Sequence, residues 1–96
     1  MDQESRVLVV KNLIETGNIK QFKEIFLYIH KKYVRDKLGV NYSRFLNLIK
    51  NPKKFRYEET QFIANIFHVT HRSISELIHN QMDASKPERP KKKATK

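Results

Sequence analysis

Apolar residues recur at intervals of three and four along most of the chain, which is the spacing of one face of an α-helix. The pattern runs from Val7 to Met82, and no segment shows the strict alternation that marks a half-buried strand. Residues Val7 to Val10 favour a strand by propensity alone, but Leu13 and Ile14 continue the helical spacing. We therefore predict an all-α fold, a compact bundle of five to six helices.

Capping and turn residues divide this pattern into separate helices. Gly17 and Gly39 are placed to end a helix in the left-handed conformation, and Pro52 stops a later one. Asn18 and Asn41 are placed to cap the helices that follow. The expected inward faces are Ile19, Phe22, Ile25, Phe26, Ile29 and Tyr33, then Phe45, Leu48 and Ile49, then Phe62, Ile63, Ile66 and Phe67, and finally Ile74, Leu77, Ile78 and Met82.

The two closing helices carry their own start signals. Glu58 and Glu59 suit the positive end of a helix dipole, which explains this pair better than a role in acid and base catalysis. The residues from Ser73 to Glu76 have the form of a capping box, so we expect Thr70 or Ser73 to cap the last helix.

The composition excludes several classes of function. The chain has 96 residues and no cysteine, so it has no disulfide, no thiolate zinc site and no cysteine nucleophile. No apolar run approaches the ~20 residues that span a bilayer or forms a signal-peptide core, so we expect a cytoplasmic protein. His68 and His71 lie near each other without a carboxylate cluster, and no nucleophile is paired with a base. We predict no metal, no cofactor, no small-molecule substrate and no enzymatic activity.

The chain divides into three parts by composition. Residues 1–17 form a helical extension, residues 18–83 form the main domain, and residues 84–96 form a tail. The tail contains two prolines, a run of lysines and no large apolar residue, so it has no apolar surface to offset the entropy of ordering. We expect it to be disordered.

The net charge of +10 is unevenly distributed. Residues 1–30 are neutral, residues 31–56 carry +8, residues 57–83 carry −3 and the tail carries +5. A solvated surface usually mixes its signs more evenly. The concentration of positive charge in one internal stretch indicates an anionic partner that contacts this stretch.

The same stretch has the pattern of a helix-turn-helix. Residues 31–51 read as a short helix, a glycine turn and a second helix, with apolar residues spaced to lock two helices at a steep angle. The segment YVRDKLGVNYSRF, from Tyr33 to Phe45, resembles the helix-turn-helix of lambda repressor-like (XRE-type) regulators. The likeness covers about residues 19–80, and the layout from Leu13 resembles small bacterial proteins of this superfamily.

One position departs from the family pattern. Arg35 stands four residues before Gly39, where the family usually has alanine or another small residue because the two helices touch there. Either the helices cross at a wider angle in this chain, or the stem of Arg35 carries its charged end out to solvent.

The second helix of the motif can be oriented without the family. At 100° per residue, Phe45, Leu48 and Ile49 define its buried side. Ser43, Asn47 and Lys50 then point outward, and Arg44 lies on the shoulder between the two sides. Arginine pairs well with guanine and asparagine with adenine, so this outward face can read base edges or contact phosphates.

The resemblance implies how this helix would dock. Residues 41–51 would form the recognition helix in the major groove of DNA. The base-contacting residues would be Asn41, Tyr42, Ser43, Arg44 and Asn47, and the phosphate-contacting residues would be Lys31, Lys32, Lys50, Lys53 and Lys54. Tyr42 falls toward the buried side, so core packing and a phosphate contact remain alternatives for it.

We therefore predict a protein that binds duplex DNA in a sequence-specific manner. It would be a repressor-like transcriptional regulator associated with the nucleoid. Members of the family usually read paired half-sites as homodimers, so the resemblance also implies a homodimer. One alternative is a protein-interaction or antitoxin-type adaptor on the same fold, which Arg35 and the acidic residues 57–83 favour. A second alternative is a single-stranded nucleic-acid binder that uses the tail, although the chain lacks a set of exposed aromatic stacking residues.

Overall fold

The computed structural model describes residues 3–85, which form α-helices and short 3-10 helices and no strand. The elements are α1 (Gln3–Glu15), the 3-10 helix η1 (Phe22–Leu27), α2 (Lys31–Leu38), α3 (Tyr42–Lys50), the 3-10 helix η2 (Pro52–Lys54), α4 (Tyr57–Ile66) and α5 (His71–Ser85). The predicted all-α bundle is confirmed. No helix within residues 3–85 is long and apolar enough to cross a membrane.

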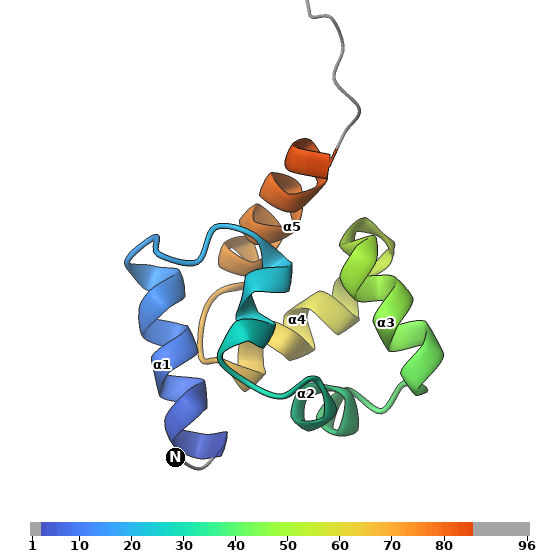
Figure 1. The fold of residues 1–96 in the computed structure, drawn as a ribbon, viewed down its shortest axis with the longest axis horizontal. Coiled ribbons are helices and arrows are strands. Elements are labelled where there is room, and N and C mark those ends of the chain that lie inside the picture. The colour runs from blue at the N-terminus through green and yellow to red at the C-terminus, as the bar shows by residue number, and fades with distance from the viewer. Residues whose placement is uncertain (1–2, 86–96) are drawn as a thin grey trace, which may run out of the picture.

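Helices α4 and α5 connect the two sides of the bundle. Figure 1 shows α1 on one side of the molecule and α3 on the other, with α4 between them. Helix α4 packs against both α2 and α5, and α5 also contacts η1 and η2. Because α3 packs against the same two 3-10 helices, its position depends on α5 through them.

One core joins all parts of the described chain. Its buried apolar residues are Val7, Val10, Ile14, Ile19, Phe22, Ile25, Ile29, Val34, Phe45, Leu48, Ile49, Phe55, Ile63, Ala64, Phe67, Ile74, Leu77 and Ile78. The first three belong to α1, so this helix contributes to the same core as the residues of the helix-turn-helix pattern. The segment Val7 to Val10 is helical, as its continuation by Leu13 and Ile14 predicts.

Gly17 ends α1 as predicted. Its φ is +81°, and its N–H donates to the carbonyl of Ile14 at 3.2 Å. The next N–H, from Asn18, donates to the carbonyl of Leu13 at 2.9 Å. This pair of hydrogen bonds is the Schellman motif, which needs a left-handed residue at the position of Gly17.

The prediction that Asn18 caps the helix after Gly17 is wrong. Asn18 lies in a turn, where its Nδ2 donates to Thr16 Oγ1 at 2.8 Å, and regular structure resumes only with η1. The carboxylate of Glu24 accepts hydrogen bonds from the backbone N–H groups of Lys20 and Gln21 at 2.7 and 3.1 Å, which fixes this later start. Ile19, Phe22, Ile25 and Ile29 are nonetheless buried. Phe22 and Ile25 share one face of η1, because residues three apart in a 3-10 helix point the same way.

One prediction for the closing helices needs correction. Phe62 was expected to face inward but is 43% exposed, whereas Thr60 and Ala64 are buried beside Ile63. These three residues lie on one face of α4, and at 3.6 residues per turn Phe62 falls on nearly the opposite side of the helix. The expected face of α5 is correct, with Ile74, Leu77 and Ile78 buried and Met82 packed against the core.

Of the two predicted caps of α5, Thr70 and Ser73, the structure has Thr70. Thr70 Oγ1 accepts a hydrogen bond from the backbone N–H of Ser73 at 3.1 Å, so α5 starts before the predicted capping box. At its other end α5 includes Ala84 and Ser85, the first residues of the segment predicted to be a disordered tail. Residues 86–96 lie outside the described residues.

Candidate nucleic-acid interface

Two residues, Gly39 and Asn41, determine the turn between α2 and α3. Gly39 has a φ of +83°, and its N–H donates to the carbonyl of Arg35 at 2.8 Å, which ends α2. Asn41 starts α3 because its Oδ1 accepts a hydrogen bond from the backbone N–H of Arg44 at 2.8 Å. Both roles agree with the sequence prediction. The chain therefore turns from one helix into the next within residues 39–41.

One side of α3 is anchored in the core. The predicted inward residues Phe45, Leu48 and Ile49 are buried. A buried glutamine of α5, Gln81, donates through Nε2 to the carbonyl of Ile49 at 2.8 Å. Its Oε1 accepts a hydrogen bond from the backbone N–H of Lys23 at 2.7 Å. Gln81 therefore ties the end of α3 and the start of η1 to the same point on α5.

The opposite side of α3 carries polar residues. Ser43, Asn47 and Lys50 are exposed, as the 100° periodicity predicts. Asn41 is exposed at the start of the helix. Tyr42 is 50% exposed, so it lies outside the core. This face offers hydroxyl, amide and ammonium groups, which can hydrogen-bond to base edges or phosphates.

Arg44 is held by an ion pair with Glu59, which was not predicted from the sequence. Its Nη1 and Nη2 donate to the two carboxylate oxygens of Glu59 on α4, at 2.7 and 3.0 Å. Arg44 retains 34% of its side-chain exposure, and Glu59 retains 14%. The pair therefore links α3 directly to the first turn of α4.

The protonation of both partners reflects this contact. Hydrogen bonding from Arg44 lowers the pKa of Glu59, and the backbone N–H of Arg56 lowers it further, against the opposing effect of burial. Hydrogen bonding to Glu59 raises the pKa of Arg44. Glu59 also acts in the first turn of α4, as predicted, because its Oε1 accepts from the N–H of Arg56 at 3.0 Å.

The start of α2 is basic. Lys31 and Lys32 are exposed there. Lys32 Nζ lies 2.8 Å from Asp36 Oδ2, and hydrogen bonds from Lys32 and Arg35 lower the pKa of Asp36. Lys31 makes no ion pair within residues 3–85. An exposed pair of this kind contributes little to stability, so Lys32 can exchange its carboxylate for a phosphate at low cost.

Arg35, the departure from the family pattern, lies between α2 and α3. Its Nη2 pairs with Asp36 Oδ1 at 2.8 Å, and its guanidinium carbon lies 5.9 Å from the ring centre of Tyr42. The side chain is 28% exposed, so its stem is largely covered. The charged end thus stays at the protein surface beside Tyr42 instead of extending freely into solvent.

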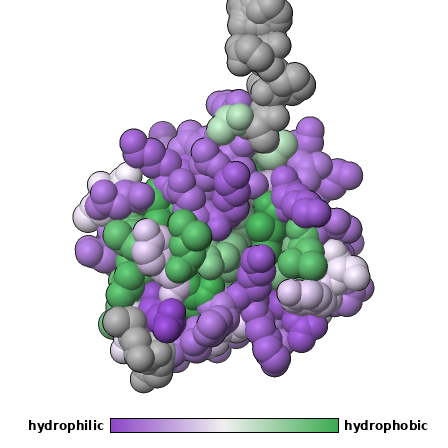
Figure 2. All heavy atoms as spheres, viewed as in Figure 1, coloured by the Kyte–Doolittle hydropathy of each residue, from purple (hydrophilic) through white to green (hydrophobic). Residues whose placement is uncertain are grey.

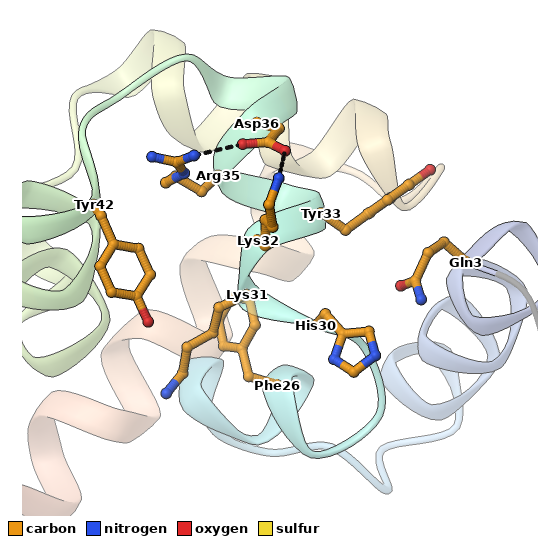
Figure 3. Close-up of a pocket in the computed structure, with 9 residues that line it drawn as sticks. All are labelled: Gln3, Phe26, His30, Lys31, Lys32, Tyr33, Arg35, Asp36 and Tyr42. Carbon is orange, nitrogen blue, oxygen red and sulfur yellow. Dashed lines mark hydrogen bonds and ion pairs between the residues drawn. The ribbon is translucent and has the colours of Figure 1, made fainter.

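A hollow of about 820 Å³ adjoins this basic region. Figure 3 shows that α2 supplies most of its lining, with Gln3 of α1 on one side and Tyr42 of α3 on the other. Phe26 and Tyr33 contribute aromatic surface, and the lysines at the start of α2 contribute positive charge. The hollow therefore lies directly next to the first turn of α3.

A second group of lysines follows α3. Pro52 is buried at the start of η2, and Lys53 and Lys54 are exposed on this short helix. Lys50 is exposed at the end of α3. In the described part of the chain these three lysines make no ion pair, so their charges face solvent. Positive side chains thus lie before and after the polar face of α3.

Figure 2 shows how polarity is distributed on one face of the molecule. Hydrophobic side chains gather on the side where α1 lies, and hydrophilic side chains cover the edge where α2 lies. A further hollow of about 610 Å³ is lined by residues of α1, α2 and α4 and by His68, with Val7, Tyr33, Phe62 and Ile66 beside Glu4, Lys37 and Asn65. The two hollows share Tyr33, so the basic region of α2 lies next to this second hollow.

His68 and His71, the two histidines that lie near each other in the sequence, occupy a turn and a ring-stacking contact. His68 adopts a left-handed conformation after α4, with a φ of +58°. His71 stacks on Tyr57, with the ring centres 4.1 Å apart, and its Nδ1 lies 3.3 Å from Ser75 Oγ. Among residues 3–85 no group of three histidine, cysteine or acidic side chains is placed to hold a metal ion.

Comparison with known proteins adds no relative. No known protein family matches the chain, and no curated protein or solved structure matches it either. The resemblance to lambda repressor-like regulators therefore depends on the residue pattern around Gly39 and Asn41. The function proposed below depends on the surface chemistry of α2, α3 and η2.

Proposed function

We propose that this chain binds duplex DNA in a sequence-specific manner and acts as a repressor-like transcriptional regulator. The observation that carries the proposal is the two-sided character of α3. One side is anchored in the core and by Gln81, and the other presents Ser43, Asn47 and Lys50 to solvent. A single α-helix fits the major groove of B-form DNA, so α3 is proposed as the recognition helix.

The proposal assigns two kinds of contact. The groups that would approach base edges are Asn41, Tyr42, Ser43, Arg44 and Asn47, and the groups that would approach phosphates are Lys31, Lys32, Lys50, Lys53 and Lys54. Their solvent-facing ammonium groups, on elements before and after α3, support the second assignment. A homodimer on paired half-sites completes the proposal, as the resemblance implies.

Selection of bound duplexes from a random library tests the proposal. The full chain should enrich a consensus sequence, and a palindromic consensus would indicate two half-sites and a homodimer. Asn47→Ala should relax the preference at one base position by ~1–3 kcal/mol, whereas Lys53→Ala should weaken all sequences alike. Enrichment of no consensus, or identical behaviour of both variants, would contradict the proposed roles.

The hollow that exposes Phe62 favours a second candidate function, a protein-interaction module. Phe62 exposes 43% of its surface in a hollow that Val7, Tyr33 and Ile66 also line. Exposed apolar surface of this kind is typical of protein contacts. A chain without duplex affinity that binds a purified protein partner, and loses that partner with Phe62→Ser, would support this candidate over DNA binding.

A further inference from the structure

Glu59 holds Arg44 from a fixed position. Its Oε1 accepts hydrogen bonds from both the backbone N–H of Arg56 and Nη2 of Arg44, each at 3.0 Å. Its Oε2 accepts from Nη1 of Arg44 at 2.7 Å. Because the carboxylate is bound to the backbone at the start of α4, it sets the orientation of the guanidinium, and the guanidinium does not set the orientation of the carboxylate.

The two side chains differ in exposure. Glu59 retains 14% of its side-chain surface and Arg44 retains 34%, so the carboxylate lies on the inner side of the pair. Each terminal nitrogen of Arg44 gives one hydrogen to Glu59. The Nε–H group and the second hydrogen of each terminal nitrogen donate to neither carboxylate oxygen, so they remain available for an acceptor on the outer side.

An acceptor with two adjacent atoms fits such a guanidinium. Guanine presents O6 and N7 in the major groove, and arginine is their commonest partner. A free arginine side chain loses rotamer entropy when it binds, whereas a guanidinium already fixed by a carboxylate loses less. The carboxylate therefore prepares Arg44 for recognition instead of only neutralising it.

We propose that Glu59 is a positioning residue for base recognition, which aims Arg44 at a guanine edge next to the first turn of α3. The proposal rests on the DNA-binding function proposed above. In this arrangement Glu59 touches no base. Its substitution acts on DNA recognition through Arg44, and it lowers the preference for guanine at one position more than it lowers the overall affinity for DNA.

The experiment uses the full chain and the duplex that the wild-type chain selects. Binding is measured for this duplex, for its single-base variants and for a duplex with 7-deazaguanine, which lacks the N7 acceptor. Arg44→Ala should reduce discrimination at one guanine about tenfold. Glu59→Gln should reduce it at the same guanine, and the double variant should lose no more than Arg44→Ala. The 7-deazaguanine duplex should weaken the wild type but not Arg44→Ala.

A matched control separates positioning from charge. Glu58 is exposed on the same turn of α4, so Glu58→Gln changes the net charge as Glu59→Gln does and should leave discrimination unchanged. Glu59→Gln keeps an acceptor for the N–H of Arg56, and thermal unfolding shows whether it is folded. If Glu59→Gln is not folded, Arg44→Lys takes its place. This variant keeps the positive charge but cannot form the bidentate hydrogen bonds of a guanidinium, and it should show the same loss of discrimination.

The outcomes distinguish the two proposals. Two outcomes overturn the positioning role while DNA binding stands. In the first, Glu59→Gln leaves discrimination unchanged. In the second, Glu59→Gln and Arg44→Ala weaken binding to all sequences equally and reduce its dependence on salt. The second outcome would identify Arg44 as a phosphate contact. Failure of the wild-type chain to bind any duplex overturns the proposed function, and the positioning role with it.

Discussion

Gln81 and Ile49 join the last helix to the proposed recognition helix. The buried side-chain amide of Gln81 donates to the carbonyl of Ile49 at 2.8 Å, and its oxygen accepts from the N–H of Lys23 at 2.7 Å. The bond to Ile49 is buried and the bond to Lys23 is partly buried. Since a buried polar group needs a hydrogen bond, this glutamine fixes where α3 ends relative to α5.

Gln81→Ala should therefore destabilise the fold. The substitution removes the hydrogen-bond partner of two backbone groups, the carbonyl of Ile49 and the N–H of Lys23. Each one that water cannot reach then costs about 1–3 kcal/mol of stability. Asn80→Ala is the matched control, because Asn80 donates to the carbonyl of Lys20 in an exposed position. Chemical denaturation should give a loss several times larger for Gln81→Ala, and equal losses would contradict the anchoring role.

The cap of α3 can be tested separately from its surface. Asn41→Ala removes the acceptor for the N–H of Arg44 and should lower the free energy of unfolding by about 1 kcal/mol. Asn47→Ala, on the exposed face of the same helix, should leave stability unchanged or raise it slightly because alanine has the higher helix propensity. Denaturant titration checks both, and a larger loss for Asn47→Ala would contradict the assigned cap.

The left-handed positions predict opposite effects for two substitutions. His68 has a φ of +58°, and a side chain in this conformation costs about 1 kcal/mol relative to glycine. His68→Gly should therefore stabilise the chain by up to that amount. Gly39→Ala should destabilise it by a similar amount through conformation alone, because a Cβ at Gly39 meets no atom within 4 Å. Thermal unfolding that shows the same sign for both variants would contradict this account.

Acid should remove the contribution of the ion pair between Arg44 and Glu59. Pairing lowers the pKa of Glu59 below its ordinary value of 4.5, so the folded state holds the charged form more tightly than the unfolded chain does. The resulting stabilisation is complete above that value and declines as the pH falls through it toward the lower folded-state pKa. Wild type should therefore exceed Glu59→Gln in stability at neutral pH, and the difference should vanish in acid.

Asp36 provides a comparison for this pH dependence. Hydrogen bonds from Lys32 and Arg35 lower its pKa from the ordinary value of 3.8, so its contribution is complete above that value and declines as the pH falls through it. The carboxylate of Asp36 is more exposed than that of Glu59, and salt screens exposed charges more strongly. Added salt should therefore reduce the effect of Asp36→Asn more than that of Glu59→Gln, and the reverse order would contradict the difference in burial.

Local patterns predicted much of the proposed interface. A glycine after a short helix, an asparagine before the next one and three apolar residues at helical spacing determine α2, the turn and the buried side of α3. Each of these signals acts within a few residues of the chain. The exposed positions of Ser43, Asn47 and Lys50 then follow from helix geometry alone.

Contacts between distant residues could not be predicted in this way. Arg44 and Glu59 are separated by another helix, η2, and each has an adequate local explanation, one as an exposed arginine and the other as a helix-start glutamate. Gln81 gives no signal in the sequence, because a glutamine on a helix is ordinarily exposed. Phe62 was misplaced since helical spacing alone leaves the phase of α4 uncertain among several neighbouring apolar residues.

The salt dependence of duplex binding tests the central proposal most directly. The full chain and a chain ending at Ser85 are titrated with the same duplex over a range of salt concentrations. If the basic residues of α2, α3 and η2 neutralise about six phosphates, log K should fall against log salt with a slope near −5 for the shortened chain. A steeper slope is expected for the full chain, because residues 86–96 add positive charge. A slope near zero, or loss of all binding on removal of residues 86–96, would contradict duplex recognition through α3.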